Sequence, residues 1–225
     1  MTSHNSKITE DQIYKGQAVY SKRVLNIYDI AVLGVSNRYI WKCTTPILLD
    51  WFNQHVSSNH LELGVGTGYF PDHCHFPSKT PHLKLVDLNQ GALGYASERL
   101  RRYRPKTQVH DLLKPFDKHS ETFDSISLNY VLHCLPGNLQ TKAIVFDHIL
   151  PLLNTNGTVF GSTILQGGVK RNLAASCLMG IYNRKGIFNN TQDDLDTLHN
   201  ELNARFASVD IRVTGCVARF SAKGY

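Results

Sequence analysis

A glycine-rich turn directly after a short apolar run is the feature that most restricts how this chain folds. The run covers residues 60–65, and the turn carries Gly64, Gly66 and Gly68 at every second position, with Glu62 two residues ahead. Glycine has no Cβ, so such a turn bends sharply and lets a ligand approach the backbone. A strand that ends in a turn of this kind is typical of a Rossmann-like domain, where ligands bind at the carboxyl ends of the strands.

The spacing of these glycines separates the turn from two other ligand-binding turns. Its order is acidic-x-G-x-G-x-G. A dinucleotide-binding turn has G-x-G-x-x-G, and a phosphate-binding loop ends in Lys followed by Ser or Thr. The sequence therefore disfavours a nicotinamide-dependent oxidoreductase and offers no phosphate-binding loop.

Apolar, strand-like runs alternate with helix-like segments along the rest of the chain. Strands are predicted over residues 60–65, 83–87, 107–111, 123–128, 158–165, 209–213 and 217–221, and helices over 91–103, 142–153 and 191–206. This alternation implies parallel strands with helices on both faces. Thr214-Gly215-Cys216 predicts a hairpin between the last two strands. We expect an α/β fold: a Rossmann-like, seven-stranded, mostly parallel sheet with a C-terminal antiparallel hairpin.

A helical cap is predicted ahead of the sheet. We divide the chain into an N-terminal helical cap at residues 1–56, integrated with the domain, and a Rossmann-like domain at residues 57–225. Two helices are expected in the cap, namely residues 11–35 and a second helix capped by Ser36 or Asn37, which carries the apolar residues from Ile40 to Phe52 and is broken at Pro46. The stretch from Gly168 to Arg184 indicates either a helix or a lid.

Composition and charge suit one globular domain. The chain has 225 residues, of which 42 % are hydrophobic and 19 % charged, so a packed core is expected. The net charge is +6, but the basic residues are scattered and their densest cluster, residues 99–106, is typical of a helix end. A nucleic-acid patch and a site for an acidic substrate or phosphate are the alternatives. We expect no nucleic-acid partner and leave the oligomeric state open.

Other classes of protein lack their usual signals here. The five cysteines show no C-x-x-C spacing, and the histidines show no metal-ligand spacing, so we expect neither a metal site nor a disulfide framework. No run of eighteen apolar residues occurs, and residues 1–11 resemble neither a signal nor a transit peptide. We therefore expect no membrane partner and, by default, a cytoplasmic location.

Two aspartates end the second and third predicted strands. Asp87 follows Gly68 by nineteen residues, and a carboxylate there can accept hydrogen bonds from both hydroxyls of a ribose. Asp111 can accept from an adenine amino group while Leu112 covers the ring. Alternatively, Asp87 caps a helix that starts at Asn89, Asp111 caps a turn, and Glu62 is a buried polar residue at an edge. In a Rossmann strand order, one nucleoside would touch all three strand ends.

At this point the sequence resembles the class I S-adenosylmethionine-dependent methyltransferases, particularly the small-molecule methyltransferases of microbial and fungal secondary metabolism. The resemblance covers about residues 14–165 by motif, on residues 62–68, Asp87, Asp111 and residues 129–133. It implies that S-adenosylmethionine is the cofactor, and that a small molecule is the methyl acceptor. The implied cofactor-binding residues are Glu62, Gly64, Gly66, Thr67, Gly68, Asp87, Leu88, Asn89, His110, Asp111, Leu112, Asn129 and Tyr130.

Methyl transfer needs mainly proximity and orientation, and a base is needed where the acceptor carries a proton of high pKa. His133 follows the fourth strand and is the candidate catalytic base, and the alternative is a histidine that merely packs in its turn. His110 and Tyr14 are weaker candidates. The predicted substrate-binding residues are Tyr14, Tyr20, Tyr28, Trp41, Met179 and Tyr182, which alternatively belong to the core.

Two further functions stay open on the sequence. A methyltransferase-like protein can bind the cofactor and guide a rearrangement or cyclisation without transferring a methyl group. An RNA or protein methyltransferase is the second alternative, and the basic charge favours it.

Overall fold

A computed structural model describes residues 29–117 and 119–224, and it describes side chains from Leu33 onward. Its centre is one seven-stranded sheet in the order β3-β2-β1-β4-β5-β7-β6. The strands are β1 (Asn59–Leu63), β2 (His82–Asp87), β3 (Lys106–Val109), β4 (Phe123–Asn129), β5 (Leu153–Ile164), β6 (Ser208–Thr214) and β7 (Val217–Lys223). Strands β1 to β5 are parallel, whereas β7 is antiparallel to both β5 and β6. The predicted sheet and its C-terminal hairpin are confirmed.

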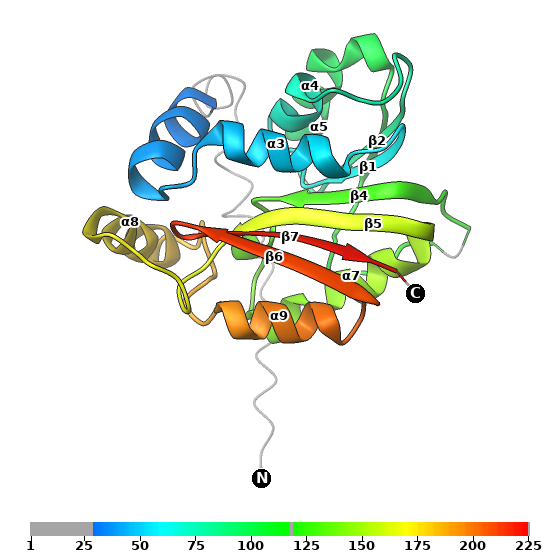
Figure 1. Cartoon of the computed structure of the whole chain (residues 1–225). Coiled ribbons are helices and arrows are strands. Elements are labelled where there is room, and N and C mark those ends of the chain that lie inside the picture. The colour runs from blue at the N-terminus through cyan, green and yellow to red at the C-terminus, as the bar shows by residue number, and fades with distance from the viewer. Residues whose placement is uncertain (1–28, 118, 225) are drawn as a thin grey trace.

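Helices cover both faces of this sheet, and Figure 1 shows the two groups. On one face lie α3 (Thr45–His55), α4 (Tyr69–His73) and α5 (Gln90–Arg99), and on the other lie α6 (Leu139–Lys142), α7 (Ile144–Ile149) and α9 (Leu195–Asn203). Two more helices, η1 (Asp29–Ile40) and α8 (Leu173–Arg184), lie together beyond the end of the sheet where β4 and β5 finish. Asn172 joins them, because its Nδ2 donates to the Ile40 carbonyl over 3.0 Å.

Side-chain caps start four of these helices. Asn89, Asn138, Asn172 and Asp194 each accept hydrogen bonds from backbone N–H groups of the first turn of α5, α6, α8 and α9. Such caps satisfy donors that have no partner within the helix. Short 3-10 turns complete the chain at η2 (Arg101–Tyr103), η3 (Leu132–Cys134) and η4 (Leu150–Leu152).

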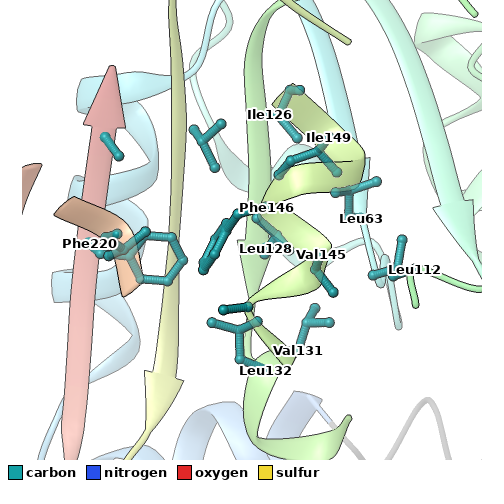
Figure 2. Close-up of a cluster of buried hydrophobic side chains, with 14 of the residues drawn as sticks. Leu63, Leu112, Ile126, Leu128, Val131, Leu132, Val145, Phe146, Ile149 and Phe220 are labelled. Carbon is teal, nitrogen blue, oxygen red and sulfur yellow. The ribbon is translucent and has the colours of Figure 1, made fainter. Parts of the chain in front are cut away.

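The core is divided by the sheet. On the α7 side, leucines of β1 and β4 and Ile126 of β4 pack with Phe146 of α7 and Phe220 of β7, whose ring centroids are 6.0 Å apart (Figure 2). The opposite face holds the aromatic residues Trp41, Trp51, Phe52 and Phe160. β1 serves both faces because its side chains alternate, with Leu61 and Leu63 in the first cluster.

Several predicted boundaries are wrong. The helix expected at 142–153 is interrupted into α6, α7 and η4, and β5 begins at Leu153, five residues earlier than the strand expected at 158–165, with a register shift near its start. The last helix, expected over 191–206, begins only after Asp194, whose side chain supplies the cap. α5 ends at Arg99, and β3 ends at Val109.

The cap also differs from the prediction where it is described. η1 runs through Ser36 and Asn37, so neither residue begins a second helix. Pro46 lies in the first turn of α3, where its missing N–H costs no hydrogen bond, and it breaks nothing. Residues 11–28 of the expected first helix lie outside the described residues, and η1 begins at Asp29. Within residues 29–117 and 119–224, no helix combines the length and the apolar character that a bilayer span requires.

Candidate cofactor and acceptor site

The glycine turn leaves β1 in a conformation that suits glycine alone. Gly64, Gly66 and Gly68 have φ of 64°, 53° and 72°, in the left-handed region. A Cβ on Gly64 would lie 2.5 Å from Cγ2 of Val131, whereas a Cβ on Gly66 would meet nothing within 4 Å. The turn is therefore packed against the end of β4 at Gly64 and faces open space at Gly66.

Asp87 is tied to this turn. Its Oδ2 accepts the Gly66 N–H at 3.3 Å, and its Oδ1 accepts the Asn89 N–H at 2.9 Å. Burial raises the pKa of Asp87, and these backbone donors act against the shift. A carboxylate has about four lone-pair sites, so two donors leave acceptor capacity for ligand hydroxyls.

Leu88 and Asn89, which follow Asp87 and were also predicted to bind the cofactor, differ in their contacts. The Asn89 side chain accepts from Gly91 N and Ala92 N at 2.8 and 3.1 Å, so it caps α5. Leu88 is half-buried between them. The helix cap that was one alternative for Asp87 is thus supplied by Asn89.

Asp111 lies close to the same edge. The His110 N–H donates to the Asp87 carbonyl at 3.2 Å, which joins the ends of β2 and β3. Asp111 Oδ1 accepts the Leu113 N–H at 3.0 Å, so the carboxylate shapes the following turn, as one interpretation expected. Its Oδ2 lies 3.9 Å from the Lys114 ammonium. The His110 ring packs against Phe116 at a tilt of 30° with centroids 4.0 Å apart, and Leu112 is buried in the core.

The end of β4 brings two more predicted residues to this region. Asn129 is 8 % exposed, its Oδ1 accepts from Ser162, and its Nδ2 is a buried donor without a hydrogen-bond partner among the described residues. Tyr130 has φ of 59°, which is strained for an aromatic residue and is held by its hydroxyl donating to Asn37 Oδ1 at 2.8 Å. Strained backbone of this kind is concentrated at functional sites.

These residues fit an adenosyl cofactor with an amino-acid tail. The open face of Gly66 admits a ligand to the backbone, and Asp87 offers acceptors for vicinal hydroxyls. The orphaned Nδ2 of Asn129 is a donor that a ligand can satisfy. Thr67 is buried within the turn, and Glu62 lies beneath it on β1. The groups gather at one edge of the sheet as a Rossmann site requires.

His133 lies deeper than a solvent-facing base. It is 2 % exposed, and its Nδ1 accepts the Ile164 N–H at 3.2 Å. The ring makes edge contacts with Tyr130 and with Phe188, whose centroid is 4.5 Å away. Burial lowers the pKa of His133 to about 3, with the Lys142 charge acting in the same direction. The ring is therefore neutral at physiological pH.

Phe188 also connects the predicted acceptor-side residues. Trp41 and Tyr182 contact its ring at centroid distances of 5.9 and 5.0 Å. Trp41 is 1 % exposed and Met179 is fully buried in the same cluster, while Tyr182 is half-buried. Tyr14, Tyr20 and Tyr28 lie outside the described residues. The structure thus places Trp41, Met179 and Tyr182 in one apolar cluster beside His133, in which Trp41 and Met179 are core residues.

Sequence reasoning missed several residues of this region. Phe188 is the aromatic hub, and it lies four residues beyond the 168–184 segment that was considered as a helix or a lid. Asn37 is fully buried in η1, and its Nδ2 donates to Thr45 while its Oδ1 accepts from Tyr130. Lys142 and Asp193 form a buried ion pair at 2.6 Å, and Lys142 also donates to the Asn189 carbonyl. Nothing in the spacing of those two residues predicts that they meet.

Comparison with known proteins agrees with this geometry. A family model described as "Methyltransferase domain" matches residues 61–159, which include the glycine turn. The chain is 34 % identical to Demethylluteothin O-methyltransferase of Streptomyces thioluteus over 98 % of this chain and 96 % of that protein. It is 38 % identical to the Physcion biosynthesis cluster O-methyltransferase of Aspergillus chevalieri over 92 % of this chain and 94 % of that protein.

A solved structure, the complex of DhpI with SAH (S-adenosylhomocysteine), shares the fold. Its TM-score is 0.67 at 15 % identity, and the match covers 96 % of this chain and 99 % of that one. The similarity to the two O-methyltransferases extends over almost the whole chain, and the strand order and glycine turn agree with it. The chain therefore belongs to the class I S-adenosylmethionine-dependent methyltransferases.

Proposed function

We propose that this enzyme transfers a methyl group from S-adenosylmethionine to an oxygen atom of a small, largely aromatic acceptor. One observation carries the proposal: the hydrogen bond from Gly66 N–H to Asp87, which joins the open glycine turn to the carboxylate that would hold the ribose. The relatives named O-methyltransferases support oxygen as the accepting atom.

The cofactor supplies an electrophilic methyl group on a sulfonium, which is a good leaving group. The residues of the chain bind the cofactor and orient its methyl group toward the acceptor. The proposed cofactor-binding residues are Glu62, Gly64, Gly66, Thr67, Gly68, Asp87, Leu88, Asn89, His110, Asp111, Leu112, Asn129 and Tyr130. Orientation of the reacting atoms can supply roughly 7–11 kcal/mol of the barrier without a base.

The proposed acceptor wall is aromatic and apolar. Tyr182 and Phe188 stand beside Tyr130 and His133, with Trp41 and Met179 packed behind them. Such a wall favours a planar apolar acceptor over a nucleic acid. Two arginines of the basic cluster, Arg99 and Arg102, are paired with Asp72, which supports an acceptor other than nucleic acid. The cytoplasmic location stays a prediction.

The role of His133 as a base also stays a prediction. Its neutral, buried ring and its bond from Ile164 support a second interpretation, in which it positions Tyr130 and Phe188. We expect His133→Ala to lower turnover more than it lowers cofactor affinity under either interpretation. Normal turnover in this variant would leave His133 with a purely structural role.

The test is methyl transfer by the purified chain. S-adenosylmethionine with a deuterated methyl group is incubated with a panel of phenols and enols, and products are detected by mass spectrometry. A product that gains one labelled methyl on oxygen supports the proposal. A cyclised or rearranged product without the label favours the non-methylating alternative, and label in RNA or protein, with salt-sensitive binding, favours a macromolecular acceptor.

A further inference from the structure

A hydrogen-bonded network of buried polar side chains lies beneath the glycine turn, on the face of β1 that carries α3 and α4. His60 and Glu62 are two residues apart on β1, so their side chains point to the same face. They are 0 % and 2 % exposed. A buried carboxylate is costly unless partners satisfy it, so the hydrogen bonds around Glu62 need explanation.

Two donors from neighbouring strands converge on one oxygen of Glu62. Ser127 on β4 donates its hydroxyl to Oε2 at 2.5 Å, and Nε2 of His60 lies 3.1 Å from the same oxygen. The Ser127 hydrogen is used in that bond, and Nε2 also lies 3.1 Å from Ser127 Oγ. Both neighbours of Nε2 are therefore acceptors toward it, so Nε2 carries a hydrogen.

The other ring nitrogen is served by a second serine. Nδ1 of His60 lies 2.7 Å from Ser125 Oγ, which in turn lies 2.8 Å from Ser57 Oγ. The Ser57 hydroxyl donates to the Asn59 carbonyl, so Ser125 can turn its own hydrogen either to Nδ1 or to Ser57. Neutral and protonated imidazole are both satisfied, and in both states Nε2–H faces Glu62.

Aromatic rings close this group off from water. Phe52, Phe76 and Phe160 surround His60, with ring centroids 5.5, 6.1 and 5.9 Å from the imidazole. In such surroundings a hydrogen bond to a charged group is stronger than at the surface. The second oxygen of Glu62, Oε1, makes no hydrogen bond with the described part of the chain.

We propose that His60 is a positioning residue for the cofactor. This role rests on the proposed function. The Nε2–H of His60 and the hydroxyl of Ser127 fix Oε2 of Glu62 in place. The carboxylate is then aimed so that Oε1 receives the ammonium group of the cofactor's methionine portion. The adenosine portion, held by Asp87 and Asp111, does not depend on His60.

Two ligands separate this role from a structural one. S-adenosylhomocysteine carries the ammonium group, whereas methylthioadenosine has the same nucleoside and sulfur without the amino-acid tail. We expect His60→Leu to weaken S-adenosylhomocysteine binding about tenfold to a hundredfold in calorimetry, since a hydrogen bond to a charged group is lost. Its affinity for methylthioadenosine stays at the wild-type value.

Three variants complete the test. His60→Gln places an amide N–H near the position of Nε2, and we expect it to restore binding. Ser127→Ala removes the second donor to Glu62 Oε2, and we expect it to lower the affinity for S-adenosylhomocysteine but not for methylthioadenosine. This variant provides the test if His60→Leu fails to fold. His82→Leu is the matched control, because His82 pairs with Glu121 at 2.9 Å on the exposed start of β2.

The outcomes are distinct. Equal loss of both ligands in His60→Leu and Ser127→Ala, or unchanged S-adenosylhomocysteine binding, overturns the inference and leaves the proposed function standing. A wild-type chain that binds neither ligand overturns the proposed function and the inference with it.

Discussion

Gly66 donates its backbone N–H to Oδ2 of Asp87 over 3.3 Å, so the turn after β1 and the carboxylate that ends β2 form one unit. The Asn89 N–H holds the other carboxylate oxygen at 2.9 Å. A carboxylate fixed at both oxygens is already oriented before a ligand arrives. Such preorganisation lowers the entropic cost of binding.

Asp87→Ala is expected to weaken S-adenosylhomocysteine binding by more than about tenfold and to leave the fold intact, because a charge-assisted acceptor is lost from the turn that ends β2. Titration calorimetry measures the affinity, and circular dichroism checks the fold. Asp196→Ala, an exposed carboxylate on α9, is the control. Wild-type affinity in Asp87→Ala would reject the ribose assignment.

Gly64→Ala and Gly66→Ala are expected to differ. Both place a Cβ at positive φ, which costs about 1–2 kcal/mol. At Gly64 the new methyl also meets Val131 at 2.5 Å, and overpacking adds about 1–3 kcal/mol. At Gly66 it enters open space, where it obstructs the ligand instead. Urea unfolding and calorimetry should show Gly64→Ala losing more stability and Gly66→Ala losing mainly affinity; the reverse order would contradict this packing.

His133 makes the folded state sensitive to acid. Its pKa in the folded chain, about 3, lies below the ordinary value of 6.5, so the unfolded chain binds the proton more readily. The contribution of His133 to stability is complete above pH 6.5 and is lost as the pH falls from there toward 3. From about pH 7 to about pH 5, wild type should lose about 2 kcal/mol more unfolding free energy than His133→Asn. Parallel pH profiles for the two proteins would exclude this linkage.

The buried pair of Lys142 and Asp193 is expected to behave as a couple. Lys142→Met or Asp193→Leu alone leaves a buried charge uncompensated, which costs about 3–5 kcal/mol. The double variant removes both charges and should recover much of that loss, since apolar replacements of buried ion pairs are often neutral. Chemical denaturation of the four proteins in a double-mutant cycle measures the coupling, and additive losses would argue against it.

Much of the fold could be predicted from local sequence patterns. Short strands between helices, the glycine turn after β1, and Gly215 between the last two strands are signals confined to a few neighbouring residues. They predicted seven strands and the antiparallel hairpin. The break of the helix at 142–153 was missed, because α6 carries its own capping box and the chain enters β5 at Leu153.

The site was harder to predict from the sequence, because it depends on contacts between residues that lie far apart in the chain. Asp87 was found as the end of β2, whereas Asp111 lies two residues beyond the end of β3, and its hydrogen bond from the Leu113 N–H matches the turn that one interpretation expected. His133 was named from its place after β4, and its burial comes from Phe188, which lies far along the chain beyond β5 and α8. Pairings such as Ser127 with Glu62 follow from strand register, which no spacing along the chain encodes.

The position of β7 in the sheet determines the order in which the last strands can pair during folding. β7 is the last strand in the chain, yet it sits between β5 and β6, and β6 joins the sheet through it. During synthesis, β6 leaves the ribosome before its hydrogen-bonding neighbour exists. The final side of the domain therefore closes only once residues 217–223 have emerged, and a nascent chain halted before them exposes an unpaired β5 edge that is open to mispairing.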